Sequence, residues 1–180
     1  MVSFENIQNY SIEFPDEWTF LWSAEEARQI SNAHKDQIYF LNDEATNFVN
    51  RYLETSKIIG RLEDPISQNY FNNIEKYQIT ENTADLKKWL FNTNLPFDKF
   101  VFTDCTSGGY SIMLTWKMVI KYCEGLFFSE DLYIFDNTLN WALFYYHENE
   151  ITFGLKKIYN KEIEYDKALI VNQIIQKLNK

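Results

Sequence analysis

The sequence is poor in cysteine: among 180 residues it has only Cys105 and Cys123, far apart and without a CxxC pair. A disulfide framework is therefore not indicated, and both thiols are expected to be reduced. Long apolar runs are also missing, since Lys117, Lys121 and Asp136 interrupt the longest candidates well short of the roughly 20 residues that span a bilayer. The N-terminal sequence MVSFENIQNYSIEF lacks the basic and apolar regions of a secretory signal. We therefore expect a cytoplasmic protein.

Basic residues are outnumbered, with 17 Lys and Arg against 26 Asp and Glu, which gives a formal net charge of -9. Binding to nucleic acid requires a surplus of cations that displaces counterions from phosphates, so nucleic acid is not an expected partner. An acidic surface instead suits a basic protein partner, whose approach it accelerates. The alternative is that the charge only keeps a small domain soluble.

Motifs that hold metals or phosphates are missing as well. The sequence contains neither HExxH nor a cysteine cluster, so no metal site is expected, and no cofactor-binding motif is found. Ser107-Gly108-Gly109 lacks the lysine and the following helix of a phosphate loop and is interpreted as a turn. Cys105 has Asp104 as its charged neighbour, which opposes thiolate formation and disfavours a nucleophilic role.

The sequence has two histidines. His147 is followed by Glu148, but neighbours on a strand point to opposite faces, so the two side chains cannot easily act as a catalytic pair. We interpret His147 as a solvent-side residue at a hairpin end. His34 is expected in the last turn of a helix, where a positive charge suits the helix dipole. No catalytic residue is assigned, and the protein is not expected to be an enzyme.

Length and an apolar content of 46% predict a single domain, residues 1–180. Its first half is expected to be mainly helical. One helix is predicted from Ser23, an N-cap residue, to about His34, and a second from Asn42 or Asp43, with Gly60 as its stop. Apolar residues of the second helix recur every three or four positions and form one stripe: Ala45, Phe48, Val49, Tyr52 and Leu53.

The segment from Arg61 to Thr80 is rich in Asn and Gln and shows no sustained period, so it is interpreted as a long irregular connection. A third helix is predicted from Thr83, ended by Asn94 and Pro96. The pattern then becomes that of strands. A hairpin is predicted from Phe100 to Leu114, with its turn at Gly108-Gly109.

A further helix is predicted from Trp116 to Cys123, with Thr115 as its N-cap and Gly125 as its stop. The chain is expected to end in a docked helix from Asp166 to Leu178. Together these elements predict an α+β fold: an antiparallel sheet of about five strands in the C-terminal half, helices packed against one face, and a helical N-terminal half.

The segment from Asp131 to Gly154 is predicted to be an antiparallel meander. Turns are expected at Asp136-Asn137-Thr138 and Glu148-Asn149-Glu150, between alternating apolar runs. Period-two spacing predicts that one set of side chains faces the core: Leu132, Ile134, Trp141, Leu143, Ile151 and Phe153.

The passage from Leu114 to Gly154 contains TW opening a helix, LFFSEDLYIFD, LNW, a strand ending in HE, and ITFG. In these motifs it resembles the C-terminal half of small bacterial immunity proteins, which are encoded beside polymorphic toxins, including those of contact-dependent growth inhibition. It covers about a quarter of the chain, and each motif is short. Proteins of these families bind and block a cognate toxin, and they have no catalytic residues to carry over.

The resemblance implies a basic toxin partner, such as a nuclease-type domain. Turns present side chains to solvent, so the candidate partner-binding residues are acidic residues at strand ends: Asp104, Asp131, Asp136, Glu148 and Glu150. Only some of them can lie at one end of the sheet. Two alternatives remain open: an interaction or regulatory domain of a mobile element, and a small hydrolase using His147 with an acidic cluster.

Overall fold

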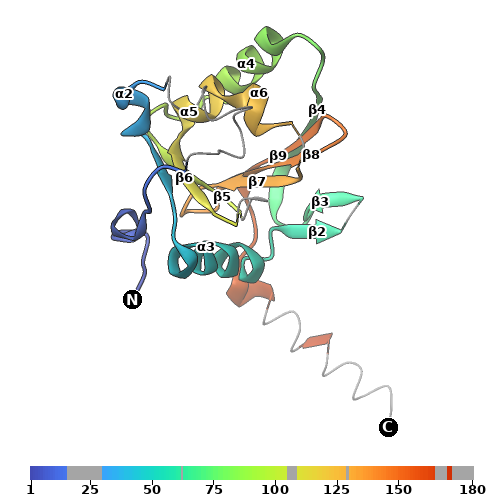
Figure 1. Ribbon diagram of the computed structural model, residues 1–180. Helices are drawn as coiled ribbons and strands as arrows, with labels where there is room; N and C mark the ends of the chain where they lie inside the picture. Colours follow the sequence, from blue (N-terminus) through green and yellow to red (C-terminus); the bar gives the residue numbers. More distant parts are fainter. Residues whose placement is uncertain (16–29, 62, 105–108, 129, 165–169, 172–180) are drawn as a thin grey trace.

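A seven-stranded antiparallel sheet forms the centre of the structure, which is a computed structural model (Figure 1). The structure describes residues 1–15, 30–61, 63–104, 109–128, 130–164 and 170–171. The strand order is β1-β6-β5-β7-β8-β9-β4, and β2 pairs with β3 in a separate hairpin. The strands are β1 (Ile38–Phe40), β2 (Ile59–Arg61), β3 (Asp64–Ile66), β4 (Phe71–Gln78), β5 (Phe100–Thr103), β6 (Ile112–Thr115), β7 (Leu132–Phe135), β8 (Trp141–Tyr146) and β9 (Glu150–Lys157).

Helices cover both faces of this sheet. The helical segments are η1 (Ile7–Tyr10), α2 (Asn32–Lys35), α3 (Asp43–Thr55), α4 (Thr83–Asn92), α5 (Trp116–Lys121) and α6 (Cys123–Leu126). In Figure 1, α2, α4, α5 and α6 lie above the sheet, whereas α3 and the β2-β3 hairpin lie below it. Two hydrophobic clusters, one on each side, fill these layers. The prediction that helices pack against one face only is therefore wrong.

The meander is confirmed, and its six predicted core-facing residues are all buried in the upper cluster. The residues between them are buried in the lower cluster: Tyr133, Phe135, Ala142 and Phe144. A strand buried on both faces has no polar side to display, which explains the continuous apolar runs LYIF and WALFYY. Both predicted turns are present, and Asn149 in the second one has φ 65°.

Helices α3 and α4 begin where the sequence predicts them. The side chain of Asn42 accepts a hydrogen bond from Ala45 N (3.0 Å), and that of Asn82 accepts one from Ala84 N (3.1 Å). Each cap satisfies a backbone N–H that the helix itself leaves without a partner. Gly60 does not stop α3, which ends at Thr55; Gly60 lies in β2, where a Cβ atom would overlap the Asp64 carbonyl.

The N-terminal half is not mainly helical, because it contributes β1 to β4. The largest error is the segment from Arg61 to Thr80, which contains β3 and the eight-residue strand β4 instead of an irregular connection. β4 has the polar sequence FNNIEKYQ, which shows no strand pattern of its own. Its backbone pairs with β9 from Phe71 to Gln78, and this pairing stabilises the segment as a strand.

Smaller differences concern helix ends. The Thr115 side chain makes no capping bond to α5 and instead lies 3.0 Å from Gln37 Oε1. Gly125 lies inside α6 and does not end it. The predicted helix from Ser23 lies mostly outside the described residues, although His34 does lie in the last turn of α2. Most of the predicted C-terminal helix also lies outside them.

Candidate functional site

Four of the five predicted partner-binding residues lie at one end of the sheet. The antiparallel register brings the end of β5 beside the start of β7, and the end of β8 beside the start of β9. We call this region the acidic sheet end and define it as Asp104, Glu130, Asp131, Glu148 and Glu150. Asp136 follows β7 and therefore lies at the opposite end of the sheet.

His147 belongs to the acidic sheet end through Asp131. Its Nδ1 lies 2.7 Å from Asp131 Oδ1, and its backbone N–H donates to the same oxygen at 3.0 Å. The two side chains are 51% and 42% exposed. The expected solvent-side position of His147 is therefore confirmed, and its carboxylate partner is Asp131 across the strand pair.

The turn between β8 and β9 is held by β4. Lys76 Nζ forms an ion pair with Glu150 Oε1 at 2.9 Å, and Gln78 Nε2 donates to the carbonyl oxygens of Glu148 (3.3 Å) and Asn149 (3.0 Å). These contacts fix the backbone of the turn, whereas Glu148 itself is exposed. Sequence reasoning missed Lys76 and Gln78 because it placed them in a loop.

Asp104 differs from the others because its carboxyl group is largely buried. Its Oδ1 accepts a hydrogen bond from Tyr133 N at 2.9 Å. Burial raises the pKa of Asp104 to about 7, the backbone hydrogen bonds oppose this rise, and the negative charges of Asp131 and Glu130 add to it. Asp104 therefore contributes less negative charge to this surface than its neighbours do.

This environment predicts a pH-dependent stability. The pKa of Asp104 is about 7 in the folded protein and about 3.9 in an unfolded chain, so the folded state holds the extra proton between these values. The contribution of Asp104 to stability is therefore full below about pH 4 and is lost as the pH rises toward 7. Asp104→Asn keeps an acceptor for Tyr133 N but does not titrate.

The measurement is the free energy of unfolding of both proteins between pH 5 and pH 8, by urea titration. We expect the variant to gain stability over wild type with rising pH, by at most about 1.4 kcal/mol per pH unit. Parallel curves for the two proteins would show that Asp104 is ionised throughout this range.

Asp136 is only 3% exposed, so the expectation that its turn presents it to solvent is wrong. Its Oδ1 accepts hydrogen bonds from Thr138 N (2.8 Å) and Leu139 N (3.1 Å), and its Oδ2 accepts one from Trp141 Nε1 (2.9 Å). Lys99 Nζ lies 3.2 Å from Oδ2. The carboxylate thus organises the β7-β8 turn and offers no contact surface.

Elsewhere, the described part of the surface has hollows at three places that concern us. A groove of about 400 Å³ runs between β3 and β4 and is lined mainly by Asp64, Pro65, Ile66, Phe71, Ile74 and Lys76. The second, about 470 Å³, lies on α3 beside the N-terminus, and the third, about 250 Å³, lies between the N-terminal segment and β5. His147 lines none of these three, and its side chain and that of Asp131 are 51% and 42% exposed.

Other candidate chemistry is limited. Cys123 is buried, and burial raises the pKa of its thiol to about 11, which disfavours a thiolate. Cys105 and Ser107-Gly108 lie outside the described residues. Within the described ranges no group of three or more His, Cys, Asp or Glu side chains is placed to hold a metal ion. No helix in that part of the chain is long and apolar enough to cross a membrane.

The fold and this surface define an α+β protein with an acidic, exposed end on a seven-stranded antiparallel sheet. Comparison of the chain with protein-family models, curated proteins and solved structures finds no match in any of the three.

Proposed function

We propose that the protein is an immunity protein that binds a cognate toxin domain in the cytoplasm of the producing cell and occludes its active site. One observation supports this most: four exposed or half-exposed carboxylates, those of Glu130, Asp131, Glu148 and Glu150, gather at one end of the sheet in a chain of net charge -9. A negative surface of this kind accelerates association with a basic partner such as a nuclease-type toxin. The short-motif resemblance of the segment from Leu114 to Gly154 points to the same class.

The first test is protection of cells. Where a toxin-like reading frame lies beside the gene, its product is expressed in a host with and without this protein, and survival is counted. We expect expression of this protein to restore growth. Equal killing in both cultures would refute the immunity function for that pair, and binding without protection would favour an interaction domain of another kind.

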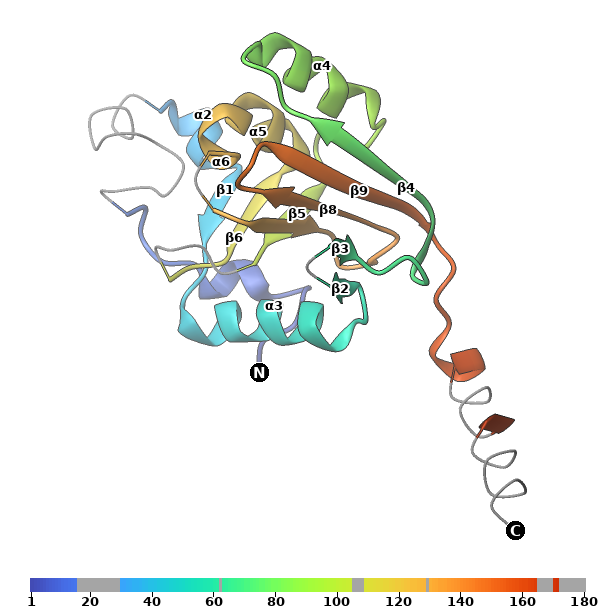
Figure 2. The same cartoon turned by 90° about the vertical axis from the view of Figure 1, so that its right-hand side faces the viewer.

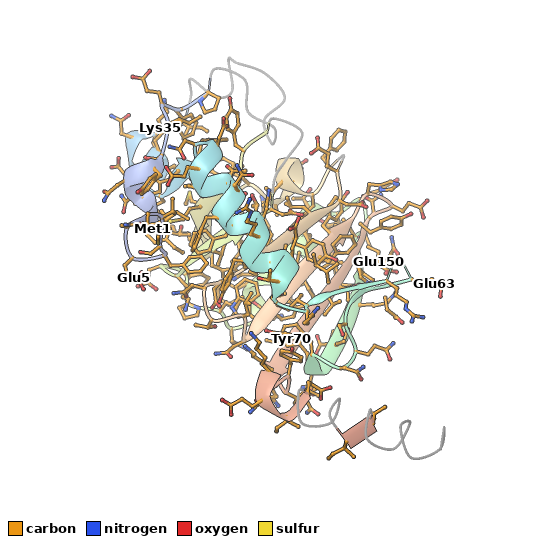
Figure 3. All side chains as sticks on the ribbon, turned by 90° about the horizontal axis from the view of Figure 1, so that it is seen from below. Met1, Glu5, Lys35, Glu63, Tyr70 and Glu150 are labelled. Atoms are coloured by element: carbon orange, nitrogen blue, oxygen red, sulfur yellow. The ribbon has the colours of Figure 1, made fainter. Side chains whose placement is uncertain are left out.

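The second test concerns the surface. Glu148→Lys combined with Glu150→Lys is expected to slow association with the toxin about tenfold at low salt, and less at high salt, because exposed charges are screened. Glu5→Lys is the matched control, since Glu5 is exposed and lies on the opposite side of the molecule from Glu150 (Figure 3). Association is measured by stopped-flow, after circular dichroism has shown that each variant is folded. Equal slowing by the control would exclude the acidic sheet end as the binding surface.

A further inference from the structure

Asp104 and Asp131 lie on one face of the sheet, at the acidic sheet end. Thr103 pairs with Ile134. The next residue, Asp104, therefore lies opposite Tyr133, and its backbone N–H donates to Tyr133 O at 3.2 Å. Residues two positions apart on an extended strand point to the same face, which places Asp131 on the face of Tyr133. Asp104 and Asp131 are thus diagonal neighbours across the strand pair, about 7–8 Å apart.

The face that carries this pair of carboxyl groups is covered. Tyr133 belongs to the lower hydrophobic cluster, and its hydroxyl donates to Pro65 O at 2.7 Å. Figure 2 shows the β2-β3 hairpin, which contains Pro65, below the sheet. Asp104 lies under this cover and is largely buried, whereas Asp131 lies two residues further along its strand and is exposed. The pair therefore joins a buried carboxyl group to one that a partner can reach.

The charges that act on Asp104 have one sign. Besides burial, which raises the pKa of Asp104 most, Asp131 and Glu130 raise it by repulsion. His147 contacts Asp131, with Nδ1 2.7 Å from Oδ1, and is positive only when protonated. The other charged residues of the elements below the sheet are not among the causes of the shift: Asp43, Glu44, Arg51 and Glu54 of α3, and Arg61, Glu63 and Asp64 of the hairpin. A second negative charge at the pair is unfavourable until a cation joins it.

We propose that a lysine or arginine of a basic partner binds at Asp131 and replaces the proton on Asp104, so that binding at the acidic sheet end strengthens with rising pH. The O–H bond of the Asp104 carboxyl group breaks, and its proton passes to solvent. The identity of the partner rests on the proposed function, in which it is a toxin, whereas the link between the proton and a bound cation does not.

The direction of the pH dependence follows from the folded-state pKa of Asp104, which is about 7. Below this pH the group holds a proton that the cation must displace, which weakens binding; above it the carboxylate is already charged, and binding is at full strength. A positive charge within about 4–6 Å lowers a carboxyl pKa by about 1–3. Because the cation pairs with Asp131 and not directly with Asp104, we take the lower value. Binding is then about fivefold weaker at pH 6 than at pH 8.

The test uses a tetralysine peptide with blocked ends, whose charge is constant between pH 6 and pH 8. NMR of the Asp104 carboxyl carbon in the full chain at low salt gives the midpoint of its titration directly. We expect the midpoint to fall by about one pH unit when the peptide saturates the protein. Peptide binding elsewhere on the surface leaves the midpoint unchanged.

A pair of variants gives a second readout. His147→Gln removes the histidine beside Asp131, and in this background the peptide should still bind about fivefold more weakly at pH 6 than at pH 8. Adding Asp104→Asn keeps an acceptor for Tyr133 N but leaves no proton to release. We expect its affinity to be the same at both pH values and close to that of the parent at pH 6. If this variant is not folded by circular dichroism, the midpoint on wild type decides alone.

Four results would overturn the proposal: no binding of the peptide at pH 8 and millimolar concentration, an Asp104 midpoint that does not move on saturation, equal affinity at pH 6 and pH 8, or the same pH dependence with and without Asp104→Asn. None of them touches the protection assay. Failure of that assay would refute the immunity function and leave the proton linkage standing, since tetralysine measures it without a toxin.

Discussion

Replacing Trp141 with alanine is expected to lower the free energy of unfolding by about 3–5 kcal/mol, the range for deleting a buried large aromatic side chain. Trp141 is 4% exposed. Its ring packs edge-on against Trp116, with the ring centroids 5.5 Å apart, and lies tilted against Phe153, with the centroids 6.0 Å apart. Its Nε1 also donates to Asp136. The substitution therefore leaves a cavity in the upper core and removes a donor from a buried carboxylate.

Urea unfolding followed by circular dichroism measures this loss. Trp141→Phe is the control, because it keeps most of the ring volume but not the indole N–H, and should lose less than the alanine variant. Unfolding of Trp141→Ala at the wild-type urea concentration would show that this ring does not belong to the cooperative core.

The second large effect is expected at Asp136. Asp136→Ala leaves the indole N–H of Trp141 without its acceptor and the Lys99 ammonium without its carboxylate, and the backbone N–H of Leu139 keeps only the backbone oxygen of residue 136. Leaving a buried donor without its acceptor costs about 1–3 kcal/mol, and the lost ion pair adds less than a fully buried pair would, because the Lys99 side chain is 35% exposed. Leu139 has φ 52°, an unfavourable conformation for a branched residue that these bonds help to hold.

Asp136→Asn is the matched variant. The amide keeps one oxygen for the turn N–H groups but turns an NH₂ donor toward Trp141 Nε1 or Lys99, so an intermediate loss is expected. Both variants are compared with wild type in the same urea experiment. If Asp136→Ala and Asp136→Asn are equally stable, the accepted hydrogen bonds do not contribute measurably.

Trp141 and Asp136 show which features of this fold can be predicted from the sequence and which cannot. Trp141 is identified as a core residue from period-two spacing alone, because alternation reports directly which side chains share a face. Asp136 has the same local signature as any acidic turn residue. Its burial depends on Lys99, which lies far away in the sequence, and on the indole that closes over it.

The acidic sheet end, too, can be predicted only in part from the sequence. The meander and its turns place Asp131, Glu148 and Glu150 near strand ends, and that much follows from the chain itself. Their gathering with Asp104 depends on which strands become neighbours, since β5 pairs with β7 across a long separation. The pairing of His147 with Asp131 depends instead on the register of β7 against β8, which sets Leu132 opposite Tyr145.

The sequence by itself determined the elements whose signals are local: the starts of α3 and α4, the β5-β6 hairpin, and the meander with its core face. Only the tertiary structure decided that the segment from Phe71 to Gln78 is a strand and that both faces of the sheet are covered. The physical reason is that the backbone of an edge strand is ordered by hydrogen bonds to its neighbour, so a polar segment can become a strand without an alternating pattern of its own.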